Sequence, residues 1–188
     1  MGSLRRDSTW AAALLAQVDP SLAHTRHNGV MHVSAKTDYG MRALLELTAC
    51  HGHDPRRLMK GEAIAAAQDV PVKFLEGILG QLRQAGIVAS QRGAEGGYRL
   101  DRDPAEITVA DVTRALDGPL VGVRGERPED LEYAGASEHL RDVWIVVRSS
   151  LRQVLETITL ADIAAGTLPA DLGLLLGAPG AWERRRSI

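Results

Sequence analysis

The chain has 188 residues, of which 45% are hydrophobic, 24% charged and 4% aromatic, a composition typical of a helix-rich soluble domain. Its net charge of −2 is unevenly spread, because residues 31–100 carry nine basic and seven acidic side chains whereas residues 101–188 carry ten and fifteen. No apolar run approaches the roughly 18 residues that cross a bilayer, and residues 1–20 lack the pattern of a signal peptide. We therefore expect a cytoplasmic protein without a membrane partner.

Cys50 is the single cysteine of the chain. This excludes an intrachain disulfide and any multi-cysteine zinc or iron–sulfur site within one chain. Cys50, His51 and His53 offer metal ligands at short spacing, but three donors without a fourth nearby favour a solvated loop over a metal site. We expect no metal and no cofactor.

Apolar side chains at helical spacing open the well-patterned part of the chain. They predict three helices, at Lys36–Cys50, Gly61–Gln68 and about Val72–Ala85. Ser34 or Thr37 can cap the first helix, Pro71 ends the second, and Gly86 is placed to end the third. The third helix carries one apolar stripe, formed by Phe74, Leu75, Ile78, Leu79 and Leu82.

A β-hairpin is predicted directly after the third helix. Ile87–Gln91 and Tyr98–Leu100 alternate as strands do. We expect Gly93, Gly96 and Gly97 to supply the positive φ angles of the loop between them. A hairpin behind two consecutive helices is the outline of a winged helix-turn-helix, which lays one helix in the DNA major groove. The acidic excess lies outside this region, so the charge distribution permits DNA binding.

The second half of the chain is again helical. Helices are expected at about Thr108–Leu116, Glu138–Thr157 and about Leu160–Ala165, with a polar loop at Leu120–Gly135. The long helix has the apolar seam of a helix that packs along its length on another helix. We expect this seam to join two chains through Leu140, Val143, Trp144, Val147, Leu151, Val154 and Leu155.

The sequence resembles the Rrf2 family of bacterial transcription regulators. Four segments carry the resemblance, namely Val33–Leu47, Phe74–Leu100, Ile107–Pro119 and Val143–Ala164. The combination of LRQAGIVASQRGAEGGY with the later TLADI element is specific, whereas neither half alone would be. The resemblance implies a homodimeric regulator with a winged helix-turn-helix and a long dimerisation helix, mainly α with a small β-hairpin wing.

One branch of this family holds an iron–sulfur cluster through three cysteines in the loop before the long helix. The corresponding loop here, Leu116–Leu140, has no cysteine, and its Asp130, Glu132 and His139 are most simply solvated loop charges. The chain therefore resembles the cluster-free branch, which includes a repressor of cysteine metabolism. That particular role does not transfer by fold.

These patterns give an expected division of the chain. A loosely ordered N-terminal extension occupies residues 1–30, and the DNA-binding domain occupies 31–118. A sensor-position loop without cysteines follows at 119–137, dimerisation helices at 138–166 and a flexible C-terminal tail at 167–188. Within the loop, Arg124, Arg127 and Tyr133 are candidates to contact a small-molecule or protein effector.

The expected DNA contacts lie on two helices and the wing, at Ser34, Lys36, Tyr39, Lys73, Phe74, Glu76, Arg83, Arg92 and Gly93. Arg92, at the base of the wing, suits a narrow minor groove. Lys73 suits a phosphate or a guanine edge. Phe74 fits core packing as well as contact with a base methyl group, and Glu76 fits a cytosine amine as well as a surface role. Gly77 departs from the family pattern, in which Gln is common.

Two functions remain open from the residues. The leading one is a DNA-binding transcription regulator, a repressor that acts as a homodimer on a palindromic operator. The alternative is a winged-helix domain that serves as a protein-interaction scaffold and binds no specific DNA. An enzyme has little support, since no nucleophile–base pair, phosphate loop or paired carboxylate motif emerges.

Overall fold

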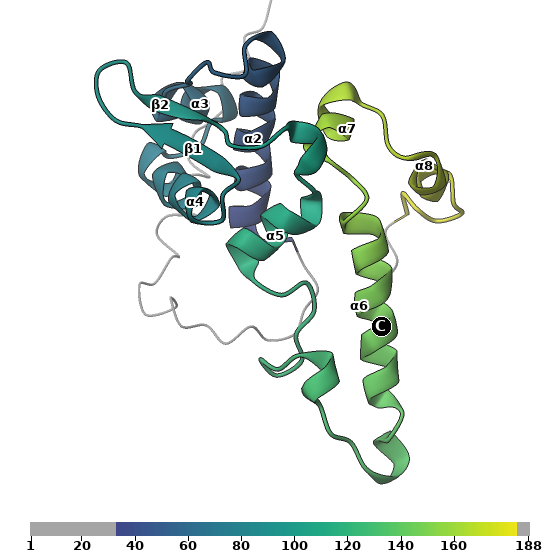
Figure 1. Ribbon diagram of the computed structural model, residues 1–188. Coiled ribbons are helices and arrows are strands. Elements are labelled where there is room, and N and C mark those ends of the chain that lie inside the picture. The colour runs from purple at the N-terminus through teal and green to yellow at the C-terminus, as the bar shows by residue number, and fades with distance from the viewer. Residues whose placement is uncertain (1–32, 184–188) are drawn as a thin grey trace, which may run out of the picture.

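The computed structural model describes residues 33–183 (Figure 1). The predicted N-terminal extension and the last five residues lie outside this range. The helices are α2 (Ala35–His53), α3 (Gly61–Gln68), α4 (Val72–Gln84), α5 (Val109–Asp117), α6 (Leu140–Leu155), α7 (Leu160–Ala165) and α8 (Ala170–Leu176). Strands β1 (Val88–Gln91) and β2 (Gly97–Leu100) form one antiparallel hairpin. Single 3-10 turns lie at Pro104–Glu106, Pro128–Asp130 and Gly135–Ser137.

The three helices α2, α3 and α4 and the hairpin form one body around a shared apolar core (Figure 1). Its largest fully buried side chains include Leu44, Leu47, Ile64, Leu75, Ile78, Leu79, Leu82, Ile87, Leu100, Ile107 and Leu160. Four of the five residues of the predicted stripe on α4 are therefore core. The fifth, Phe74, remains 43% exposed and lies on the surface.

Two matching caps tie the second half of the chain to this body. Thr108 and Asp111 form a capping box at the start of α5, and Thr159 and Asp162 form another at the start of α7. The two helix starts lie side by side, because the Leu160 N–H donates to the Ile107 carbonyl at 3.0 Å. Leu160 is fully buried there, which brings α7 into the core.

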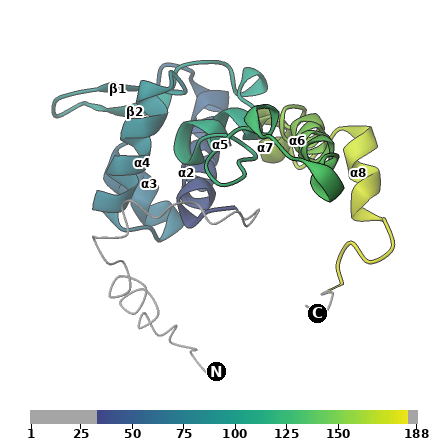
Figure 2. The same ribbon diagram turned by 90° about the horizontal axis from the view of Figure 1, so that it is seen from below.

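Helix α6 extends away from the winged body, and the view from below places α5 and α7 between them (Figure 2). It contacts chiefly α5 and the 3-10 turn at Pro128–Asp130. Although it is strongly amphipathic in sequence, none of its side chains is buried within the described part of the chain. No helix in that part is both long enough and apolar enough to span a membrane.

The structure differs from the sequence-based expectation at several element ends. Helix α2 runs on to His53 rather than ending at Cys50, and α6 is shorter than Glu138–Thr157. Helix α8 follows Pro169, in the segment where we expected a flexible tail. Pro169 is the N-cap residue of α8, and its restricted φ is compatible with the start of a helix. Leu174, Leu175 and Leu176 remain exposed. This short helix therefore lacks the buried apolar stripe from which a helix is predicted in a sequence.

Candidate nucleic-acid interface

Helix α4 is anchored on one side and open on the other. Leu75, Ile78, Leu79 and Leu82 are at most 2% exposed and fix the inner face of the helix in the core. The outer face presents Lys73, Phe74, Glu76, Gly77 and Arg83, all of them exposed. A rigid helix with one free polar face beside a hairpin is the arrangement by which a recognition helix enters the major groove.

A cleft of about 380 Å³ separates the outer face of α4 from the hairpin. Glu76 and Arg83 line it from the helix, and Arg92 and Gly93 line it from the hairpin loop. The Arg83 guanidinium donates to the Ser90 hydroxyl at 3.3 Å, which links the two walls. Four residues that the sequence named separately as DNA contacts are therefore gathered around one concave surface.

The hairpin is held beside α3 by its backbone. The N–H of Tyr98 donates to the Met59 carbonyl at 2.8 Å, and the N–H of Met59 donates to the Tyr98 carbonyl at 2.9 Å. Lys60 also lines the cleft, and its ammonium donates to the Ala94 carbonyl at 2.6 Å. Lys60 is not among the residues expected from the sequence, because a lone lysine before a short helix carries no pattern that sets it apart.

The glycines of the wing serve different purposes. Gly93 has φ of 108°, as expected for the loop. The expected positive φ is wrong for Gly96 and Gly97, which are not in that region. These two positions require glycine because neighbouring backbone atoms lie too close for a side chain. A Cβ on Gly97, for example, would lie 2.6 Å from the carbonyl oxygen of Met59. Only glycine lets the wing lie this near the chain beside it.

Tyr39 and Phe74 meet edge to face at the start of α4. Their ring centroids are 5.7 Å apart with planes at 88°, and the Arg42 guanidinium lies 5.3 Å from the Tyr39 ring centre. Of the two roles that the sequence left open for Phe74, the structure excludes burial in the core. The exposed ring is held in place by Tyr39, on the same face as Lys73.

Ser34 and Lys36, at the start of α2, are bound to the end of α5. The Ser34 hydroxyl donates to Asp117 at 2.8 Å. The Lys36 ammonium donates to the Leu116 carbonyl and lies 3.7 Å from the Asp117 carboxylate. These contacts turn the charge of Lys36, one of the expected DNA contacts, toward the end of α5.

A helix presented beside a β-hairpin on a small helical body defines the winged helix-turn-helix class of DNA-binding proteins. The family model described as "Rrf2: Iron-dependent Transcriptional regulator" matches residues 33–166. The chain belongs to the Rrf2 family and is a DNA-binding transcription regulator. The family resemblance and the predicted fold class are thus confirmed.

Individual relatives agree with this assignment. An HTH-type transcriptional regulator of Mycobacterium tuberculosis is 45% identical over 157 residues, which cover 83% of this chain and 95% of the relative. CymR of Bacillus subtilis is 39% identical over 137 residues, which cover 73% and 92%. Its solved structure, described as that of the global cysteine regulator, gives a TM-score of 0.59 at 34% identity and covers 74% of this chain and 100% of that one. The structure of T. potens IscR gives 0.55 at 33% identity and covers 76% and 96%.

The iron in the family description has no matching ligand set here. Between residues 33 and 183, no three His, Cys, Asp or Glu side chains are grouped so as to hold a metal ion. Cys50 lies near the end of α2, its sulfur 4.0 Å from the Arg57 carbonyl oxygen, and the loop after α5 contains no cysteine. The donor set does not fit an iron–sulfur cluster held by three cysteines of one chain.

Proposed function

We propose that the protein is a cytoplasmic, non-catalytic repressor that binds a palindromic operator as a homodimer. The α6 helices of two chains would pair, and the two α4 helices would enter successive major grooves. Lys73, Phe74 and Glu76 would meet base edges or phosphates, with Arg83 on the backbone and Arg92 and Gly93 at the minor groove. Ser34, Lys36 and Tyr39 would support the same face at the start of α2.

The state of α6 supports pairing of two chains. Leu140, Trp144, Val147, Leu151, Val154 and Leu155 are only partly buried within one chain, and Val143 is 50% exposed. Val146 adds a further apolar side chain at 63% exposure. An amphipathic helix with its apolar seam open to water gains stability when a second copy covers that seam.

Sedimentation analysis of three proteins tests the pairing. We expect the wild type to sediment as a dimer at micromolar concentration, whereas Val147→Glu should sediment as a monomer because it places a charge in the seam. Ser149→Glu, on an exposed position of the same helix, is the matched control and should remain dimeric. Circular dichroism checks that each variant is folded. A monomeric wild type would exclude the proposed dimer.

Protection of DNA upstream of the protein's own gene tests the operator. We expect two protected half-sites related by a dyad, about one helical turn apart. Binding should weaken steeply with salt, since phosphate contacts release counterions. Uniform protection without a dyad would contradict the palindromic site.

The loop Leu120–Gly135 is the proposed place for an effector. Its Tyr133 receives a hydrogen bond of 3.2 Å from Nε1 of Trp144 on α6, and the Arg124 guanidinium lies 5.7 Å from the centre of the Tyr133 ring. A ligand or partner protein that moves this loop would therefore act on the helix proposed to pair the chains.

A further inference from the structure

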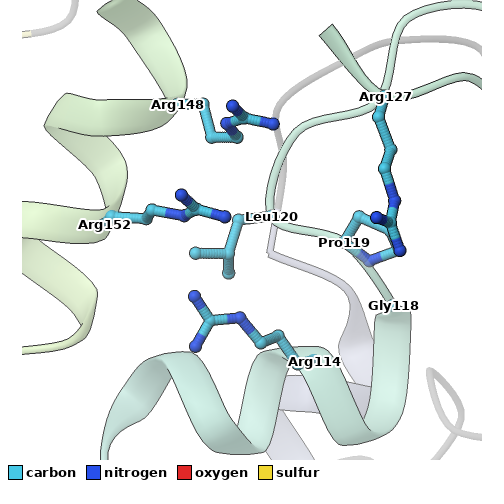
Figure 3. A pocket seen from close by; sticks show the side chains of 7 residues that line it. All are labelled: Arg114, Gly118, Pro119, Leu120, Arg127, Arg148 and Arg152. Atoms are coloured by element: carbon cyan, nitrogen blue, oxygen red, sulfur yellow. The ribbon is translucent and has the colours of Figure 1, made fainter. Parts of the chain in front are cut away.

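Four arginines surround a cavity of about 300 Å³ between α5, the loop that follows it and α6. Arg114 comes from α5, Arg127 from the loop, and Arg148 and Arg152 from consecutive turns of α6. Figure 3 shows Arg114, Arg148 and Arg152 pointing into the space around Leu120, with Arg127 on the opposite side. Gly118 and Pro119 complete the lining.

Within the described part of the chain, the arginines around this cavity outnumber the carboxylates that pair with them. Glu156 pairs with Arg114 and lies 4.0 Å from Arg152, and Glu129 pairs with Arg148. Among residues 33–183, two carboxylates therefore form the ion pairs of these four arginines. Within residues 33–183 the Arg127 side chain has neither a hydrogen bond nor an ion pair.

Arg148 gives a second, independent indication that the cavity suits an anion. Its side chain is only 15% exposed, and its Nε is buried without a hydrogen-bond acceptor among the described residues. A buried donor of a charged group without an acceptor is costly. The pKa of Glu129 is lowered by its own backbone N–H, by Arg148 and by Arg127, which agrees with a positive field at this place.

We propose that this cavity binds a small molecule with two anionic oxygen groups, each a phosphate or a carboxylate. Guanidinium groups bind such oxyanions through paired hydrogen bonds, and two excess positive charges match two anionic groups. The apolar side chains of Leu120 and Pro119 would contact the carbon skeleton or spacer between them. This inference rests on the proposed function, in which the bound molecule is the effector of a DNA-binding regulator.

The placement favours a small molecule over the DNA backbone. Helix α4 and the hairpin lie on one side of α2 and α5, and α6 lies on the other (Figures 1 and 2). The cavity is lined from α5, the loop after it and α6, and by no residue of α4 or the hairpin. The lining of the cavity is also connected to the DNA-binding domain. Gly118, which lines the cavity, directly follows Asp117, and Asp117 accepts hydrogen bonds from the start of α2. A ligand that shifts Gly118 would therefore shift the end of α2 that carries Ser34 and Lys36.

Calorimetric titration of the full chain with sodium pyrophosphate and with sodium succinate tests the site. We expect saturable binding of at least one of them, and which one binds distinguishes phosphates from carboxylates. Arg127→Gln and Arg148→Gln should each weaken this binding about tenfold or more, since each removes a charge-assisted contact. Arg141→Gln is the matched control, because Arg141 is exposed on α6 and does not line the cavity.

Glu129→Gln gives the opposite expectation. It removes the carboxylate that occupies Arg148, so binding of the same anion should become several-fold tighter. A variant that had merely lost its fold would not bind more tightly. This gain separates the proposed site from a general effect of misfolding.

Three outcomes would overturn the proposal. They are no saturable binding of either anion, equal weakening in Arg141→Gln, and a loss of operator affinity in anion-free Arg127→Gln as large as that in Lys73→Ala. The last result would mean that the cavity binds phosphates of DNA. Operator binding by the anion-free wild type tests the proposed function separately, so the two failures are distinguishable.

Discussion

The hydroxyl of Ser34 donates a hydrogen bond of 2.8 Å to Oδ1 of Asp117, which joins the N-cap of α2 to the last residue of α5. The same hydroxyl accepts from the Thr37 N–H at 3.0 Å, so Asp117 orients the cap. The Thr37 hydroxyl donates to the second oxygen of Asp117 at 2.7 Å. One carboxylate thus fixes the first turn of the helix that carries Tyr39 and Lys36.

Replacing this carboxylate should destabilise the whole winged body. We expect Asp117→Ala to lower the free energy of unfolding by about 1–3 kcal/mol, because two hydroxyl donors in a partly buried site lose their acceptor. Urea denaturation measures the change. Asp130→Ala, which removes an exposed carboxylate in the loop, should change the stability by less than about 0.5 kcal/mol. Equal stability of both variants would show that the Asp117 contacts contribute nothing.

The DNA contacts make a prediction for Arg92 and Lys73. We expect Arg92→Ala and Lys73→Ala each to weaken operator binding by about 1–3 kcal/mol, since each exposed cation would lose its contact with a phosphate or a base edge. Gel shift at several salt concentrations measures both affinity and salt slope. The slope should fall by about 1 for a variant that has lost one phosphate contact.

Arg141→Ala serves as the control for these two variants. It removes the same charge as Arg92→Ala at an exposed position on α6, away from α4 and the hairpin. Undiminished affinity in both Arg92→Ala and Lys73→Ala would contradict the proposed interface. Equal weakening in all three variants would point to net charge in place of specific contacts.

The sequence predicted those helices well whose apolar residues recur at regular helical spacing. The limits of α3 and α7, the cap at Ser34 and the buried face of α4 all follow from apolar spacing and cap residues. The cleft between α4 and the wing followed in part, because its residues belong to recognisable elements. Lys60 did not, since its place depends on how the hairpin folds back beside α3.

The arginine cavity shows a different limit. Arg148 and Arg152 share one helix face at a spacing of four, and that much is readable from the sequence. Their meeting with Arg114 and Arg127 depends on the angle at which α6 leaves the body and on the path of the loop. Long-range placement of this kind leaves no local pattern in the chain.

Substitution by alanine should have opposite effects on protein stability at two glycines. Gly97→Ala should destabilise the protein and disrupt the hairpin, because the new Cβ would lie 2.6 Å from a backbone oxygen of Met59. Gly77→Ala should stabilise it by up to about 1 kcal/mol, since Gly77 lies on α4 with no atom within 4 Å of an added Cβ. Thermal unfolding of the two variants measures the difference. Destabilisation by both would mean that the outer face of α4 is more crowded than the structure indicates.

The capping box of α7 predicts a pH-dependent contribution to stability. Hydrogen bonds from the hydroxyl and backbone N–H of Thr159 hold the pKa of Asp162 below its usual value of 3.8. A carboxyl whose pKa is lowered on folding stabilises the folded state above its unfolded pKa, and this contribution is lost as the pH falls through the folded pKa. Asp162→Asn should therefore lower the melting temperature at about pH 7, and its difference from the wild type should shrink toward about pH 3. Asp130→Asn, an exposed control, should match the wild type throughout. A difference for Asp162→Asn that stays constant across this range would exclude the charged cap as its cause.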